Sequence, residues 1–114
     1  MAEIHDRGRA GEDRAAAFLA ERGFTILERN FRYGKNGEID IIARKDDLVI
    51  FVEVRVRSSR SKGGALESLT PAKIGRIRST AEAFIASRPE GSIYRFDLIA
   101  LERNELEWIE DILR

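Results

Sequence analysis

Two apolar segments, residues 37–44 and 48–56, flank the polar pair Asp46-Asp47, and each segment contains carboxylates. Alternating apolar residues around a two-residue polar turn predict a β-hairpin. In this hairpin Lys45 pairs with Leu48, and Asp40 stands directly opposite Glu53. Opposed residues share a face of the sheet, where like charges repel and buried carboxylates lose their hydration. The hairpin therefore restricts the chain to folds in which an acidic pair within the sheet has a compensating partner.

Alternation assigns the side chains of the two strands to opposite faces of the predicted sheet. On the first strand we expect Glu38, Asp40 and Ile42 on one face, and Ile39, Ile41 and Ala43 on the other. On the second strand we expect one face to carry every other residue from Val49 to Arg55. The acidic residues of both strands should then converge on one side of the sheet.

A divalent cation between Asp40 and Glu53 would turn their repulsion into coordination, and Mg²⁺ is a natural choice for carboxylate oxygens near phosphate. Arg55 lies two residues after Glu53 and is directed to the same place. Hydrolysis of a phosphodiester needs a metal that polarises the phosphoryl oxygen and acidifies a water, and a cation that stabilises the developing charge. A cross-strand lattice of ion pairs, with Glu38 facing Arg55 and another arginine serving Asp40, would explain the same pattern.

The rest of the chain predicts an α/β fold in one domain, residues 1–114. Helical spacing of apolar residues predicts a helix over 6–22, and Thr70-Pro71 opens a second helix that ends near Ser87. The second helix should bury Ile74, Ile77, Ala81, Phe84 and Ile85. Strands are expected over 24–31, 37–44, 48–56, 93–101 and 106–109, with a loop over 57–69. This α-β-β-β-α-β-β order predicts a central mixed five-stranded sheet flanked by helices.

Composition is that of a globular protein, with 43% hydrophobic and 35% charged residues. The chain has no cysteine, so it has neither a disulfide framework nor a thiolate metal site. No apolar stretch approaches the length of a membrane span, and the N-terminal residues lack the apolar core of a signal peptide. We therefore expect a cytoplasmic protein that does not bind membranes.

Charge is unevenly distributed along a chain whose formal net charge is zero. Cations dominate residues 54–81, and acids dominate residues 102–114. A second basic cluster, Arg29 to Lys35, includes Tyr33, and an aromatic ring among cations suits base stacking. Such segments can form a phosphate-binding surface, although a solvated charged surface is the alternative. The candidate nucleic-acid contacts are Arg32, Lys35, Arg57, Arg60, Lys62 and Arg76.

Three short motifs carry a resemblance to known proteins: Gly11-Glu12, Gly37-Glu38-Ile39-Asp40 and Phe51-Val52-Glu53-Val54-Arg55. In this order and spacing they resemble the restriction-endonuclease-like, or PD-(D/E)XK, nuclease superfamily. Its signature is an acidic residue on one strand followed by Asp/Glu-X-Lys on the next. The chain is most similar to the bacterial family YraN, or UPF0102, and is more distantly similar to archaeal Holliday junction resolvases. The likeness extends over residues 8–97.

The resemblance implies a nuclease fold that uses Mg²⁺ or Mn²⁺. The implied metal ligands are Glu12, Asp40, Glu53 and the carbonyl of Val54. Arg55 occupies the position where the superfamily usually has a lysine that activates water. Because arginine stays protonated, it can clamp phosphate but cannot act as a general base. Lys73, in the first turn of the second helix, could supply the missing ammonium group.

The sequence therefore predicts a nucleic-acid-binding protein of nuclease fold that cleaves DNA, at branched or damaged sites, with Mg²⁺. One alternative is a binding module in which Arg55 has impaired hydrolysis. Another is an interaction domain that docks a partner through the second helix and the acidic C-terminal end. The likeness to junction resolvases also leads us to expect a two-fold dimer. For Asp97, within an apolar strand, we expect an ion pair with Arg95 or Arg103.

Overall fold

The computed structural model of the chain describes the backbone of residues 2–57 and 65–113, and the side chains of residues 9–57 and 66–113. Within these residues the predicted α/β fold, a five-stranded sheet flanked by two helices, is confirmed, and the elements follow the predicted order. The helices and strands are α1 (Ala2–Glu21), β1 (Thr25–Tyr33), β2 (Gly37–Lys45), β3 (Leu48–Arg57), α2 (Pro71–Ser87), β4 (Ile93–Glu102) and β5 (Glu105–Ile109). The predicted loop over 57–69 contains a short 3-10 helix, Ala65–Ser68.

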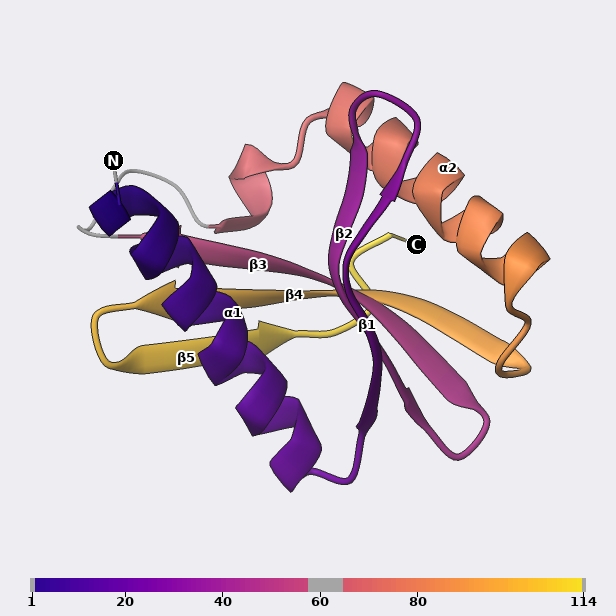
Figure 1. The fold of residues 1–114 in the computed structure, drawn as a ribbon, viewed down its shortest axis with the longest axis horizontal. Coiled ribbons are helices and arrows are strands. Elements are labelled where there is room, and N and C mark those ends of the chain that lie inside the picture. The colour runs from indigo at the N-terminus through magenta and orange to yellow at the C-terminus, as the bar shows by residue number, and fades with distance from the viewer. Residues whose placement is uncertain (1, 58–64, 114) are drawn as a thin grey trace.

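The strands lie in the order β1-β2-β3-β4-β5, and β3 and β4 are parallel while every other neighbouring pair is antiparallel. A connection between parallel strands must cross a face of the sheet, and α2 lies within the connection from β3 to β4. Helices α1 and α2 cover opposite faces of the strongly twisted sheet (Figure 1). The mixed sheet of the sequence prediction is therefore confirmed.

Each helix buries its apolar side against one face of the sheet. Ala15 and Leu19 of α1 pack with Ile41 and Ile50, and all four are fully buried. This core depends on burial of large aliphatic side chains, each of which contributes about 1.5–3 kcal/mol relative to exposure.

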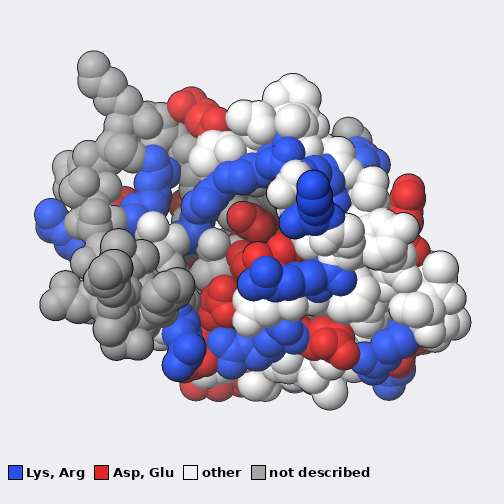
Figure 2. Space-filling model, turned by 45° about the horizontal axis from the view of Figure 1, so that its top comes forward, with Lys and Arg blue, Asp and Glu red and all other residues white. Residues whose placement is uncertain are grey.

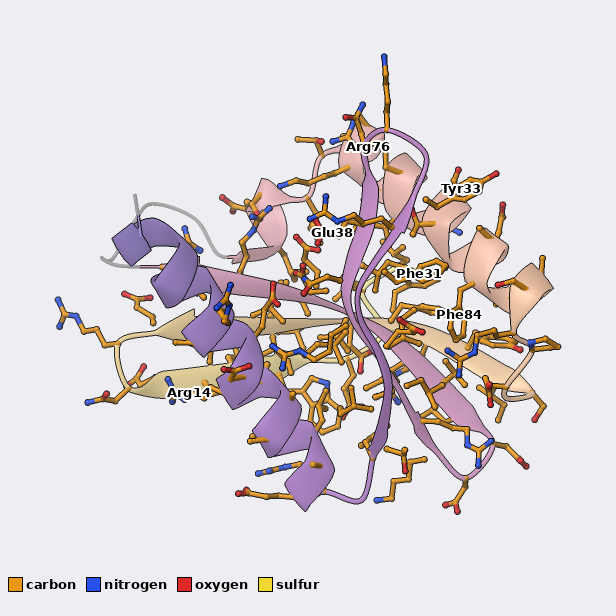
Figure 3. The ribbon with its side chains drawn as sticks, in the orientation of Figure 1. Arg14, Phe31, Tyr33, Glu38, Arg76 and Phe84 are labelled. Atoms are coloured by element: carbon orange, nitrogen blue, oxygen red, sulfur yellow. The ribbon has the colours of Figure 1, made fainter. Side chains whose placement is uncertain are left out.

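On the other face, Phe84 of α2 makes an edge-to-face contact with Phe31 at a ring-centre distance of 5.4 Å (Figure 3). It makes a second such contact with Phe51, at 6.0 Å. Of the predicted apolar stripe of α2, Ile77, Ala81 and Phe84 are buried, whereas Ile74 and Ile85 are half-buried. The aromatic contacts fix α2 on the sheet and thereby place its first turn.

The hairpin β2–β3 has the predicted register over part of its length. Lys45 pairs with Leu48 and Ile41 pairs with Val52, around a turn in which Asp46 has a φ of 53°. The ladder ends at Ile41 and Val52. Beyond this pair β3 continues beside β4, β2 continues beside β1, and the two strands diverge (Figure 1). The hairpin is therefore a fork, and Asp40 and Glu53 are the first residues inside it.

The predicted faces of β2 are wrong at one end. Ile39 packs with Ile42 on the α2 side, whereas Ile41 packs on the α1 side. The alternation breaks at Asp40, opposite Asn30 of β1, which has a φ of 54° and no partner in the ladder. Because a residue with positive φ turns the backbone out of regular strand geometry, the strand pair rotates here.

Helix α2 begins as predicted. The hydroxyl oxygen of Thr70 accepts a hydrogen bond of 3.2 Å from the backbone N–H of Lys73, and Pro71 occupies the first helical turn. This cap stabilises the first turn of α2.

Asp97 of β4 forms the predicted ion pair, and its partner is Arg95, at 2.7 Å. The fully buried carboxylate also accepts hydrogen bonds from the indole N–H of Trp108 and the backbone N–H of Asp111, each at 2.9 Å. Burial of this charge is compensated because every contact is a donor. The carboxylate thereby ties β5 and the segment after it to β4. Among the described helices, none is long and apolar enough to cross a membrane.

The close approach of β2 and α2 can be tested at Gly37. A Cβ atom here would collide with the hydroxyl oxygen of Thr80 and with the carbonyl oxygen of Tyr33. We expect Gly37→Ala to lower the free energy of unfolding by about 1–3 kcal/mol, because the neighbours must shift. Gly75→Ala is the matched control, since its Cβ would meet no atom within 4 Å, and it should raise stability by up to about 1 kcal/mol. Urea unfolding of both variants checks this, and equal stabilities would contradict it.

Candidate functional site

The fork between β2 and β3 holds a pair of acidic side chains. One carboxylate oxygen of Asp40 accepts a hydrogen bond of 2.8 Å from the backbone N–H of Val54, where a continuing ladder would supply a carbonyl group. The carboxyl groups of Asp40 and Glu53 are themselves within hydrogen-bonding contact. The two acids that the sequence placed opposite each other thus meet through their side chains at the open end of the ladder.

Burial governs the protonation of this pair. Loss of hydration raises the pKa of Asp40 from its ordinary value of 3.8 to about 8, helped by the nearby charge of Glu53 and, more weakly, of Glu12 and Glu38. The hydrogen bond from Val54 acts in the opposite direction. Burial likewise raises the pKa of Glu53, although the cations Arg55 and Lys73 and the hydrogen bond with Asp40 oppose the rise. Near neutral pH the pair therefore retains a proton unless another cation replaces it.

Glu12 reaches the same region from α1. The helix lies close to the sheet at Gly11, where a Cβ atom would collide with Val56. The Asn30 side-chain amide donates to both carboxylate oxygens of Glu12, at 3.1 and 3.2 Å, and to Glu38 at 3.2 Å. Arg29 of β1 lies 3.7 Å from Glu12. Glu12 is thus part of the acidic cluster but is held by side chains of β1.

Two further cations approach the acids from different elements. Arg55 lies 3.9 Å from Glu53, and its Nε donates a hydrogen bond of 3.0 Å to the hydroxyl oxygen of Ser68. Lys73 is half-buried and lowers the pKa of Glu53. It is therefore directed at the pair and is not a fully solvated lysine.

These side chains surround a pocket of about 170 Å³. Its lining comprises Asn36, Glu38, Asp40, Glu53, Lys73, Arg76 and Ile77. Figure 2 shows acidic side chains at the bottom of a hollow that is bordered by lysine and arginine side chains. The arrangement combines a site for a cation with a rim for an anion.

The predicted nucleic-acid contacts are distributed unevenly around this pocket. Arg76 lines it, whereas Lys35 is exposed in the β1–β2 turn, and Arg32 is exposed 3.7 Å from Glu38. Arg57 is half-buried at the end of β3. Arg60 and Lys62 lie outside the described residues.

The fork offers a small set of oxygen donors to a hard divalent cation. Asp40 and Glu53 provide oxygens that repel each other when ionised. The carbonyl of Val54 also faces β2, because the N–H and C=O of one residue leave a strand on the same side and this N–H contacts Asp40. Across the described residues, no three His, Cys, Asp or Glu side chains are placed together to hold a metal ion. Mg²⁺ nevertheless fits, because it commonly uses one or two carboxylates and keeps several waters.

Sequence reasoning missed one residue of the cluster and gave a second the wrong partner. Asn30 links Glu12 to Glu38, and its role depends on a positive φ that nothing in the sequence marks. Glu38 was expected to face Arg55, but the ladder ends before these residues can pair, and Glu38 lies near Arg32 instead. Its position two residues before Asp40 was a signal that it would reach the same cluster.

Fold and site together define an α/β protein with an acidic pocket at a fork in its mixed sheet, and comparison with known sequences places it in a family. The profile described as "Uncharacterised protein family UPF0102" matches residues 11–101, and the chain belongs to that family. A UPF0102 protein of Shewanella woodyi is 45% identical over 91% of this chain and 88% of its own length. One from Nitrosomonas europaea is 43% identical over 97% and 96%, and one from Ralstonia nicotianae is 45% identical over 91% and 83%.

The raised pKa of Asp40 predicts how stability depends on pH. Protonated Asp40 is favoured in the folded protein, so its contribution to stability is complete below its unfolded pKa of 3.8 and is lost as the pH rises through about 8. In EDTA, the free energy of unfolding should therefore fall between about pH 5.5 and about pH 8, with a slope of up to about 1.4 kcal/mol per pH unit. Urea unfolding across this range measures it. Asp40→Asn should flatten the profile, and a wild-type profile that is already flat would contradict the assignment.

Proposed function

We propose that this protein binds nucleic acid and cleaves phosphodiester bonds of DNA with Mg²⁺ or Mn²⁺. The observation that supports this proposal most strongly is the meeting of Asp40 and Glu53 inside the sheet. Both have raised pKa values, and they lie beside cations that suit phosphate. The likeness of the motifs to the restriction-endonuclease-like superfamily agrees with it. We place the protein in the cytoplasm because it has no cysteine, and a two-fold dimer remains a prediction.

In this proposal Asp40 and Glu53 hold the cation, with the carbonyl of Val54 as a further oxygen. The bound cation would supply polarisation of a phosphoryl oxygen and a lower pKa for an attacking water. Glu12, positioned by Asn30, would accept a hydrogen bond from a water of the cation. These groups explain why the acids are gathered at the bottom of the pocket.

The cations have separate tasks. Arg55 is held between Glu53 and Ser68, so its guanidinium is oriented before a phosphate arrives. It would stabilise the charge that develops on the phosphoryl oxygens. Lys73 is close enough to Glu53 to lower its pKa, and its ammonium group would assist at the same phosphate.

Cleavage should depend on the acidic pair. Asp40→Asn and Glu53→Gln should each reduce Mg²⁺-dependent cleavage of a labelled DNA by at least about 100-fold, because each removes a charged ligand of the cation. The controls Asp47→Asn and Glu107→Gln make the same chemical changes at exposed positions and should cleave like wild type. Circular dichroism of all four variants monitors folding. Equal cleavage by the wild type and both site variants would contradict the proposal.

The arginine at position 55 favours a second candidate, a nucleic-acid-binding module with impaired hydrolysis. Its guanidinium cannot accept a proton, and its contacts with Glu53 and Ser68 occupy it in the absence of substrate. Arg55→Lys distinguishes the two functions. For an impaired enzyme, nicking of plasmid DNA in Mg²⁺ should rise by about tenfold or more, since lysine can assist proton transfer. For a binding module, nicking should remain absent while salt-dependent DNA binding is unchanged.

A further inference from the structure

A second, larger hollow adjoins the acidic pocket. It lies between the β1–β2 turn, residues 33–37, and one side of α2 from Ala72 to Thr80, and it encloses about 530 Å³. Asn36 and Arg76 line both hollows, so the two adjoin at these residues. We call the larger one the turn groove. Its volume is in the range of small-molecule sites and accommodates a nucleotide.

The turn groove has an exposed aromatic wall. Tyr33, at the end of β1, is 55% exposed, and it is the one aromatic residue among the exposed large hydrophobic side chains of the described chain. A large exposed ring beside cations suits stacking on a nucleobase. Any base can stack in this way, because every base has a π-face. Tyr33 and Arg76 both lie at the end of the molecule formed by the β1–β2 turn and the first turns of α2 (Figure 3).

The cations of the turn groove are available for an anion. Seven arginines of the described chain lie within 4 Å of an acid, namely Arg22, Arg29, Arg32, Arg44, Arg55, Arg88 and Arg95. Over the same part of the chain, neither Arg76 nor Lys35 makes such a pair, although Arg76 borders the acidic pocket. A guanidinium that is not engaged with a carboxylate can form charge-assisted hydrogen bonds with phosphate.

We propose that the turn groove binds an unpaired nucleotide of a DNA strand whose neighbouring phosphate enters the acidic pocket. The Tyr33 ring stacks on the base, and Arg76 binds the phosphate between the two hollows. The preferred substrate then carries an unpaired nucleotide, at a gap or flap, because bases inside a continuous duplex are stacked on each other and do not reach Tyr33. This inference rests on the proposed function for the phosphate in the acidic pocket.

The test uses Gly75→Leu. Gly75 lines the groove, a Cβ atom added there would meet no side chain and no other element within 4 Å, and leucine favours the helix more than glycine does. We therefore expect the variant to narrow the groove while α2 stays folded. Fluorescence anisotropy in EDTA, where no cleavage occurs, compares binding of a gapped DNA and a continuous duplex of the same length. We expect wild type to prefer the gapped DNA by about tenfold, and Gly75→Leu to lose that preference.

Control variants separate the groove from the rest of α2. Ala86→Leu adds a side chain of the same size at an exposed position of the helix outside the groove, and it should bind like wild type. Tyr33→Ala should lose the preference, and Tyr33→Phe should retain it because the ring remains. With 2-aminopurine at the unpaired position, the ring should also quench its fluorescence in wild type and Tyr33→Phe. Equal affinity of wild type for both DNAs, or an unchanged preference in Gly75→Leu and Tyr33→Ala, overturns the inference.

Failure of the inference is distinguishable from failure of the proposed function. If Asp40→Asn loses cleavage while the groove variants keep the preference of wild type for gapped DNA, the nuclease proposal stands and the groove assignment is wrong. If no DNA is cleaved but the preference for gapped DNA depends on Tyr33 and Gly75, the groove assignment stands and the nuclease proposal is wrong.

Discussion

The end of the β2–β3 ladder at Ile41 and Val52 is the constraint on which the rest of the site depends. Beyond this pair β2 stays paired with β1 and β3 stays paired with β4, while β2 and β3 diverge. The backbone N–H of Val54 would lack a partner inside the fork, and the Asp40 carboxylate supplies one. This hydrogen bond draws a carboxylate into a buried position beside Glu53. At the fork, the hydrogen bond therefore satisfies a backbone N–H group. The same contact buries a carboxylate beside a second acid, which is electrostatically unfavourable.

The sequence predicts this hairpin well and its fork poorly. A two-residue turn and strict alternation fix the register, so the pairs from Lys45–Leu48 to Ile41–Val52 follow from local pattern alone. Beyond the last pair, β2 follows β1 and β3 follows β4, and the alternation of residues 37–44 gives no sign of this divergence. For this reason Ile39 was assigned to the wrong face, and the geometry around Asn30 could not be foreseen.

For the elements that carry Lys73 and Glu12 as well, the sequence predicts the local structure but not the tertiary contacts. Thr70-Pro71 predicts where α2 begins, and hence that Lys73 lies in its first turn. Its proximity to Glu53 depends on the packing of Phe84 against the sheet, which is a tertiary property. Gly11 gives a comparable case for Glu12, because close contact between α1 and β3 requires a residue without a side chain, but the sequence does not identify the contacting strand. The sequence predicts the helix or strand in which each of these residues lies. Tertiary packing alone decides which side chains of other elements contact it.

The arrangement of charge explains how a chain of zero net charge can favour an anion at one place. The acids lie at the bottom of the pocket, and Arg55, Lys73 and Arg76 lie around them. Ionised Asp40 and Glu53 would repel a phosphate, whereas a shared proton or a bound cation would cancel that repulsion and leave the surrounding cations to act. A proton does so only below the raised pKa of Asp40, about 8. Above it a divalent cation would be required, so in the proposed function metal binding and phosphate binding at this pocket would be positively coupled.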